Sequence, residues 1–518
     1  MISNEKNIKY GMLLSYLTLF ISIVISIVYT PFFLKSVGQE QYGLNSFTTS
    51  ITSWFGVLSS ALVTSYVRFA TKEYHEYKAG RRKEFGETNS AYFILFSIIG
   101  LLILVFGLIL YFILRFAILP NSIYRNNDSS KTLIMILFIV STINLSISAF
   151  GNIFGLYNNW RQKFIAIKLI TLFVNIAQPI STIPFLLLGC NIVTIAIIQL
   201  VFTVIGIVLN LFFAFFKYGY STKKPLFSVS KSIFKEIIVF CSFILLNSIV
   251  DQINTSADKT ILGFMVDDNA KSVAIYQAGM LFKNYLATLS LSISTTFVPK
   301  ISEAVISGDK ERTNKIFLYV SRFQIIIVLF IVGGFATFGK PFMILWLGEE
   351  YVNSYYVALV LFVLSSVPYT ENISIEVQRS MNKHKFRAIL YILIALINIG
   401  LTILLVSVMP KDSAIFACLI GTAISSILGH WVIINIYNYK VIKLNITKYL
   451  LMFLRITLFV LVSFAFAKLT VFLCNISDNI IILLFELLLY VSIFAIFISI
   501  FEMKFLRFFL RKGSIESL

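Results

Sequence analysis

Residues 91–114 read AYFILFSIIGLLILVFGLILYFIL, a run that contains no charged side chain. As an α-helix, a run of this length rises by about 36 Å, which exceeds the roughly 30 Å of a bilayer's hydrocarbon core. Comparable apolar runs recur along the whole chain. They are continuous, not alternating, and about twice the length of a barrel strand, so they predict membrane-spanning helices.

About fourteen apolar segments of this kind can be distinguished. The first six occupy residues 8–34, 44–67, 91–114, 132–157, 165–188 and 192–216, and the next six occupy residues 233–254, 273–298, 316–338, 356–378, 388–409 and 414–437. Two more close the chain, at residues 450–473 and 480–501. The sequence therefore predicts an all-α integral membrane protein with about fourteen transmembrane helices.

The order of the segments indicates two six-helix lobes followed by two further helices. We expect an N-lobe over residues 1–227 (spans one to six), a C-lobe over residues 228–445 (spans seven to twelve), and spans thirteen and fourteen with a cytoplasmic basic tail over residues 446–518. Basic inner loops around Gly80 and Gly308 echo one another and favour a duplication. Both halves start from the same side, which predicts a pseudo-two-fold axis along the membrane normal.

The composition fits a lipid-facing surface. Of the 518 residues, 58% are hydrophobic and 13% are charged, about half the charged share of a soluble domain. The net charge is +19, but most of the 43 Lys and Arg residues lie in short loops on one side. This pattern indicates the anionic cytoplasmic leaflet and not nucleic acid. We expect a bacterial plasma (inner) membrane protein with both termini in the cytoplasm.

Motifs of enzyme chemistry are missing from the sequence. The chain has no GxxxxGK[ST] phosphate loop, no HExxH zinc motif and no GxSxG nucleophile elbow. Its four cysteines are scattered and its three histidines lie far apart. We therefore expect no catalytic residues, no metal site and no cofactor, and the chain is predicted not to be an enzyme.

Polar residues within the spans are the functional candidates, because a charge inside a bilayer costs a few kcal/mol. In the seventh span, spacings of four, three and four residues separate Asn247, Asp251, Asn254 and Asp258, and Gln252 widens the stripe. On a helix the four residues fall within an arc of roughly 60°. Such a face borders either an aqueous cavity or a hydrogen-bonded seam between helices, and two carboxylates favour the cavity.

The second span carries an unusual density of hydroxyl groups, among them Thr48, Ser53, Thr64 and Ser65. This pattern fits close helix packing or a sugar-facing wall equally well.

Four cations lie within or at the ends of spans: Arg68, Lys259, Lys283 and Arg322. Lys283 is near mid-membrane, too deep to reach the surface easily, so it either pairs with a carboxylate such as Asp251 or binds a ligand. The other three cations each have an alternative explanation that involves no ligand. Arg322 can snorkel to the surface, Arg68 can be a positive-inside anchor and Lys259 can be interfacial.

A carboxylate at membrane depth can bind a proton or a sodium ion, so Asp251 and Glu371 are candidate sites of ion coupling. A salt bridge is the alternative for both residues. Prolines add to this pattern, because Pro179 and Pro184 are expected to interrupt the fifth span and Pro368 the tenth. Kinked helices commonly line a cavity or act as a hinge.

Five short motifs carry a family resemblance. They are TPFFLKSVGQEQYGLNSF at residues 30–47, SADKTILGFM at 256–265, AIYQAG at 274–279, FVPKIS at 297–302 and ILWLGEEY at 344–351. In this order they resemble the polysaccharide flippases (Wzx-type exporters of O-antigen, capsule and teichoic acid) of the MOP superfamily. That superfamily also holds the MATE drug exporters and the lipid II flippases. The likeness covers nearly the whole chain.

The resemblance implies a V-shaped pair of lobes around a central cavity. It implies a carrier that moves an undecaprenyl-pyrophosphate-linked oligosaccharide from the inner to the outer leaflet by alternating access. The cations expected to bind the pyrophosphate, on grounds of depth and charge, are Arg68, Lys283 and Arg322, with Lys259 as a weaker fourth. The expected partners are membrane lipids and other polysaccharide assembly proteins, without nucleic acid, and the expected state is a monomer.

Alternatives stay open. A MATE-like cation-coupled drug or metabolite antiporter would share the helical plan, although cationic drugs favour acidic cavities. A membrane-embedded polysaccharide polymerase or acyltransferase would be expected to show a sizeable outer loop or an interfacial His/Asp site. A scaffold without transport would leave the charges within the spans unexplained.

Overall fold

The computed structural model describes residues 5–81, 85–118, 128–220, 222, 229–266, 269–381, 383, 385–474 and 480–502. Within these residues the chain is helical and contains no β-strand, so the all-α membrane fold predicted from the apolar runs is confirmed. The chain divides into two compact units, Met1–Ala274 and Ile275–Leu518. The lobe boundaries and the pseudo-two-fold repeat stay predictions, and the expected basic tail after residue 502 lies outside the described residues.

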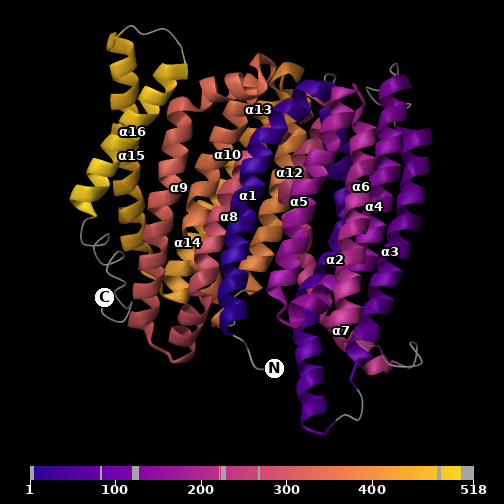
Figure 1. Ribbon diagram of the computed structural model, residues 1–518. Helices are drawn as coiled ribbons and strands as arrows, with labels where there is room; N and C mark the ends of the chain where they lie inside the picture. Colours follow the sequence, from indigo (N-terminus) through magenta and orange to yellow (C-terminus); the bar gives the residue numbers. More distant parts are fainter. Residues whose placement is uncertain are drawn as a thin grey trace. The chain divides into compact units, whose positions relative to one another are not determined.

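The first unit holds long helices that run back and forth. They are α1 (Glu5–Val37), α2 (Gln39–Lys78), α3 (Glu87–Ile113), α4 (Asp128–Trp160), α5 (Phe164–Leu187), α6 (Ile192–Phe212), α7 (Lys231–Met265) and the first turns of α8 (Asn269–Ile306). Single π-helical segments extend α3 and α6, at η1 (Leu114–Ile118) and η4 (Phe213–Lys217). The helix α2 packs against α3, α4 and α7 (Figure 1).

The second unit begins within α8. Its other helices are α9 (Lys310–Leu347), α10 (Val352–Thr370), α11 (Ile373–Ser380), α12 (Lys385–Val408), α13 (Ala414–Ser426), α14 (Ile434–Tyr437), α15 (Ile446–Cys474) and α16 (Ile480–Phe501). Two short 3-10 helices are η5 (Glu349–Tyr351) and η6 (Lys411–Ser413), and two π-helical segments are η7 (Ile427–Ile433) and η8 (Asn438–Ile442). The run from α13 to η8 is continuous and forms one span-length helix. The helices α15 and α16 lie beside α9 (Figure 1).

Twelve helical segments of the described chain are long and apolar enough to cross a membrane. Two of the expected spans, those that correspond to α2 and α8, are not among them. These helices contain 40 and 38 residues, so their polarity and not their length sets them apart. A total of fourteen spans therefore stays a prediction.

The expected break in the tenth span is present. The helix α10 ends at Thr370 and α11 begins at Ile373, so Glu371 and Asn372 interrupt the segment just after Pro368. The break expected in the fifth span is not seen, because α5 continues through both of its prolines. Membrane helices tolerate proline where other groups resupply hydrogen bonds.

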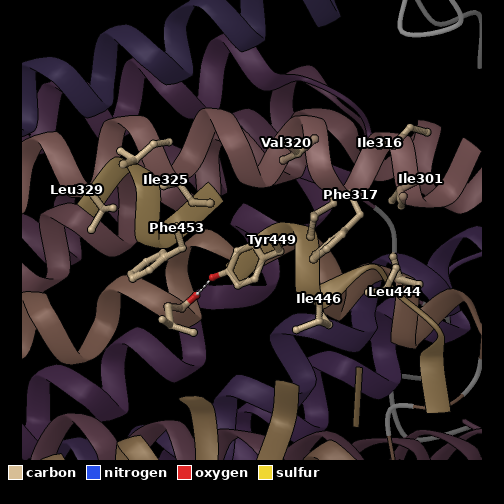
Figure 2. Packing of buried hydrophobic residues seen from close by; sticks show 14 of the residues in the cluster. Ile301, Ile316, Phe317, Val320, Ile325, Leu329, Leu444, Ile446, Tyr449 and Phe453 are labelled. Carbon is tan, nitrogen blue, oxygen red and sulfur yellow. Dashed lines mark hydrogen bonds between the residues drawn. The ribbon is translucent and has the colours of Figure 1, made fainter. Parts of the chain in front are cut away.

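Each unit has a core of buried aromatic and aliphatic side chains. In the second unit Phe317 of α9 packs against Tyr449 of α15, with Phe453 one turn further along α15 (Figure 2). The Tyr449 hydroxyl is hydrogen-bonded to the Thr370 hydroxyl at 2.7 Å, which ties α15 to the end of α10. Van der Waals packing and interhelical hydrogen bonds of this kind hold membrane helices together.

Two of the resemblance motifs meet in the first unit, where glycine allows close backbone approach. A Cβ atom on Gly43 would lie 1.6 Å from the carbonyl oxygen of Ala270. A Cβ atom on Gly263 would lie 2.0 Å from the ring of Phe47, which itself packs edge-on against Phe264 at 4.9 Å. Small residues are what let membrane helices come this close. The segments 30–47 and 256–265 therefore act as packing motifs.

Candidate functional site

A polar seam joins α2 and α7 within the first unit. The Gln252 side-chain amide donates to Ser53 Oγ at 2.6 Å and to Ser256 Oγ at 2.7 Å. One turn further on, the hydroxyls of Ser50 and Thr260 are hydrogen-bonded at 3.0 Å. Part of the hydroxyl density of the second span thus serves helix packing.

The predicted stripe of α7 lies beside this seam and not in it. Asp251 is exposed, Asn254 is half-buried and Asp258 is buried, while the side chain of Asn247 lies outside the described residues. Asp251 is about 30 Å from the start of the helix and about 21 Å from its end, by helical rise. Gln252 thus forms a seam with α2, and the Asp251 carboxylate is exposed away from both ends of the helix, while a cavity along this face stays a prediction.

The helices α2 and α8 also carry exposed polar residues in rows. On α2, Thr64 and Arg68 are exposed one turn apart. On α8, Asn284 and Thr288 are exposed one turn apart, and Thr295 follows two turns later. Thr288 is nearly midway along its helix, about 28 Å from the start. Amides and charges at such depth avoid lipid and normally border water or protein.

The threonine hydroxyl groups in these rows donate their hydrogen bonds to backbone carbonyl oxygens of their own helix. Thr64 donates to the carbonyl oxygen of Ser60 at 3.0 Å, and Thr288 donates to that of Asn284 at 2.8 Å. Each hydroxyl oxygen keeps lone pairs with which it can accept a hydrogen bond. These faces can therefore receive hydrogen bonds from water or from the hydroxyl groups of a polar ligand.

Arg68 lies beside α7 in a basic cavity of about 740 Å³. Its guanidinium group stacks over the ring of Phe240, 4.3 Å from the ring centroid. One turn further along α2, Lys72 is paired with Glu236 at 2.9 Å, and Lys235 also lines the cavity. The surplus of positive charge fits an anchor to the anionic leaflet and an anionic ligand alike.

Lys259 lies in the same unit but far from Arg68. It is half-buried next to Asp258, near the other end of α7. By helical rise, about 28 Å separates it from Phe240, over which Arg68 stacks. One pyrophosphate group is too small to contact both cations at once.

Lys283 is half-buried near the middle of α8, in the second unit. It acts electrostatically on His430, as does Arg387. Arg387 is only 6% exposed and stacks over Tyr391 at 4.7 Å, and the Tyr391 ring packs edge-on against His430 at 4.7 Å. Sequence reasoning missed this basic cluster, because Arg387 directly precedes its expected span and His430 stands alone in another.

Arg322 of α9 forms an ion pair with Glu502, directly after α16. Arg455 of α15 pairs with the same carboxylate. The Glu502 side chain is fully buried, whereas the side chains of Arg322 and Arg455 are 28% and 42% exposed. Lys283 and Arg322 thus have different surroundings, and neither unit gathers its predicted cations into one cluster. Their role in binding pyrophosphate stays a prediction.

Glu371 is fully buried at the break between α10 and α11. Its carboxylate lies within electrostatic reach of Arg387 and close to the Asn438 amide, but neither oxygen accepts a well-aligned hydrogen bond from the described residues. Nearby, Asn372 donates to Ser290 Oγ at 3.1 Å, and the Gln324 amide donates to the Ser290 carbonyl oxygen at 3.0 Å. A buried carboxylate among polar groups is suited to bind a small cation or a proton. Among the described residues no group of three or more His, Cys, Asp or Glu is placed to bind a metal ion.

Comparisons with known proteins agree with this architecture. A family model described as polysaccharide biosynthesis protein matches residues 95–356. The membrane protein EpsK of Bacillus subtilis (strain 168), described as uncharacterized, is 24% identical over 438 residues, 80% of each chain. The structure of the lipid II flippase MurJ in an inward closed conformation matches with a TM-score of 0.71 at 17% identity, over 95% of this chain and 99% of that one. An inward-facing MATE multidrug transporter matches with a TM-score of 0.59 at 15% identity, over 80% of this chain and 96% of that one.

The fold is therefore the one shared by the lipid II flippase MurJ and the MATE multidrug transporter. More specifically, the chain belongs to the polysaccharide biosynthesis protein family. The resemblance drawn from the five sequence motifs is thereby confirmed, and the chain is a multi-pass membrane protein with a transporter fold.

Proposed function

We propose that this protein is a flippase of the bacterial plasma membrane. It moves an undecaprenyl-pyrophosphate-linked oligosaccharide from the cytoplasmic to the outer leaflet by alternating access, for the synthesis of a surface polysaccharide. Both termini are in the cytoplasm, and the protein works as a monomer with membrane lipids and other assembly proteins. It carries no catalytic site in this proposal.

The exposed polar rows on α2, α7 and α8 are the observation that carries the proposal. Thr64, Asp251 and Thr288 are exposed polar residues within the expected spans, and they belong to a polysaccharide biosynthesis protein. Thr288 lies near the middle of its helix, where lipid offers no hydrogen bond. We infer that each of these faces borders water. Hydroxyl oxygens that accept hydrogen bonds suit the many hydroxyl groups of an oligosaccharide.

The separation of the cations favours handover of the pyrophosphate from one to the next. Phe240, over which Arg68 stacks, and Lys259 are about 28 Å apart along α7, close to the thickness of the hydrocarbon core. We infer that the head group meets Arg68 near the cytoplasmic side and Lys259 near the outer side, with Lys283 and Arg322 as further contacts. Because only one of these cations contacts the pyrophosphate at a time, the pyrophosphate can dissociate from each cation and move on to the next.

The coupling ion in this proposal is a proton or a sodium ion. Asp251 is the accessible carboxylate of the polar stripe, and Glu371 is the buried one at the helix break. Neutralising either carboxylate by ion binding changes the local charge, which is the means by which an ion can bias a conformational equilibrium. A MATE-like antiporter would use the same carboxylates, so substrate identity is what distinguishes the two functions.

Transport can be measured with the purified full chain in proteoliposomes that contain a fluorescent lipid-linked oligosaccharide. A membrane-impermeant quencher reports the fraction of label in the outer leaflet over time. We expect label to reach the outer leaflet faster than in empty liposomes. Removing one acceptor by Thr64→Val or Thr288→Val should slow the rate about fivefold each.

Thr203→Val is the matched control, because Thr203 makes the same backbone hydrogen bond, at 2.9 Å, on the apolar helix α6. Its rate should equal that of the unmodified protein. A rate no faster than in empty liposomes would refute the flippase. Movement of cationic dyes but not of the glycolipid would refute it as well and would favour the antiporter.

A further inference from the structure

Two helices of the second unit carry the same short pattern. Residues 315–322 of α9 read KIFLYVSR, and residues 448–455 of α15 read KYLLMFLR. Both fit Lys-x-x-Leu-x-x-x-Arg, and in each copy the positions at offsets zero, three, four and seven line one pocket. These offsets select one face of a helix. The two faces lie side by side, since α9 packs against α15.

The pocket has a volume of about 680 Å³, and every charged residue of its described lining is basic. The basic residues form two layers. Lys315 and Lys448 make the outer layer near the helix starts, and Arg322 and Arg455 make the inner layer about 10 Å deeper by helical rise. Leucines and other apolar side chains of both helices lie between the layers, among them Leu318 and Leu451.

Two carboxylates of the described chain offset part of the charge at the pocket. Glu502 pairs with both arginines, and Glu311 pairs with Lys315 at 3.2 Å. The buried Glu502 carboxylate holds the two guanidinium groups close together, while each side chain stays partly exposed. Two adjacent guanidinium groups that share one carboxylate favour a further anion, and guanidinium groups match phosphate oxygens in geometry.

We propose that this pocket binds the head group of an anionic phospholipid of the leaflet that we expect to be cytoplasmic. The arginines hold the phosphodiester, the lysines hold the outer part of the head group, and the acyl chains lie against the apolar wall. Each lysine lies one or two residues before its expected span and each arginine lies five or six residues inside it, so the arginine side chains can extend toward the level of the lipid phosphates. Basic pockets between transmembrane helices on this side are suited to such lipids. The occupant is a resident lipid and not the cargo, because the carboxylate of Glu502 disfavours the higher charge of a pyrophosphate.

The test is a binding titration of the full chain in neutral detergent with short-chain phosphatidylglycerol, and with phosphatidylcholine for comparison. Binding is read from tryptophan fluorescence and from the thermal unfolding midpoint. We expect phosphatidylglycerol, but not phosphatidylcholine, to bind and to raise the midpoint. The double variant Lys448→Gln, Arg455→Gln should weaken phosphatidylglycerol binding by about thirtyfold. Glu502 keeps Arg322 as its partner in this variant, so the fold is expected to persist.

Lys440→Gln serves as the control, because Lys440 is exposed in the same unit but does not line the pocket. It should bind phosphatidylglycerol as the unmodified protein does. Equal binding of the two phospholipids, or unchanged affinity in the double variant, would overturn the proposal. Displacement of phosphatidylglycerol by undecaprenyl pyrophosphate, but not by undecaprenol, would assign the pocket to the cargo and overturn it as well. Transport is not measured in this titration, so its outcome is independent of the flippase assay.

Discussion

A methyl group at position 43 should force α2 away from the first turn of α8. The Cβ of Gly43→Ala would lie 1.6 Å from the carbonyl oxygen of Ala270 and 2.4 Å from its carbonyl carbon. Nonbonded contacts need about 3.5 Å, so the two backbones must separate by roughly 1.5–2 Å. Overpacking costs about 1–3 kcal/mol, and the upper end applies because the obstructing atoms belong to backbone and not to a flexible side chain.

The same helix offers a matched control. At Gly56 the nearest atom to an added Cβ is Leu145 Cδ2 at 4.0 Å, which is an ordinary contact. Gly56→Ala should therefore stabilise the protein by about 0.5–1 kcal/mol, because alanine favours the helix. The two substitutions add the same methyl group to one helix, yet their free energies of unfolding should differ by about 4 kcal/mol.

The assay is the thermal unfolding midpoint of the purified full chain in detergent. A third variant, Gly263→Ala, should fall between the unmodified protein and Gly43→Ala, because its clash is with the ring of Phe47, which can move. The midpoints should thus decrease in the order Gly56→Ala, unmodified, Gly263→Ala and Gly43→Ala. If Gly43→Ala is as stable as Gly56→Ala, the close approach of α2 to Ala270 is wrong.

Three further substitutions test the polar features. Gln252→Leu removes the hydrogen bonds of Gln252 to Ser53 and Ser256 and should destabilise the protein by about 1 kcal/mol, measured by thermal unfolding. An unchanged unfolding midpoint would contradict a stabilising seam between α2 and α7. Asp251→Asn should leave the amount of folded protein unchanged but reduce the dependence of the glycolipid transport rate on pH or sodium concentration. If the rate keeps its dependence on pH and sodium, Asp251 is excluded as the coupling site. Glu502→Gln removes the buried carboxylate that Arg322 and Arg455 share and should cost about 2 kcal/mol in the same unfolding assay. Glu376→Gln, in the more exposed pair with Arg379, should cost less than about 1 kcal/mol, and similar costs for both would refute the special role of Glu502.

The helices could be predicted because an apolar run is a local property of the sequence. The break at Glu371 was foreseen from Pro368, which is local as well. For α7, periodicity identified the polar stripe but not the direction in which it points. A helical wheel fixes the angles between Asp251 and Gln252, and only the packing partner decides that Gln252 faces α2.

The surroundings of the cations could not be predicted in the same way. Depth along a span follows from counting residues, so Lys283 lies near the middle of its helix as expected. The pairing of Arg322 with Glu502 joins positions far apart in the chain, and no spacing rule connects them. The buried Arg387 was hidden for a related reason, because a basic residue at the start of a span is ordinarily a surface anchor.

The polarity of α2 bears on how the protein is made. The helix α2 is not among the segments that are apolar enough to cross a membrane, so α2 alone is expected to insert poorly into a bilayer. Its partner α7 leaves the ribosome about 190 residues later, which corresponds to roughly ten to forty seconds of synthesis. During that interval hydroxyl groups such as Thr48 and Thr52 are already satisfied by carbonyl oxygens of their own helix, which lowers the cost of waiting in lipid. The helices α3 and α4 contact α2 and are synthesised before α7, so they can pack against α2 in the nascent chain. A nascent chain that ends before α4 should therefore leave α2 outside the membrane.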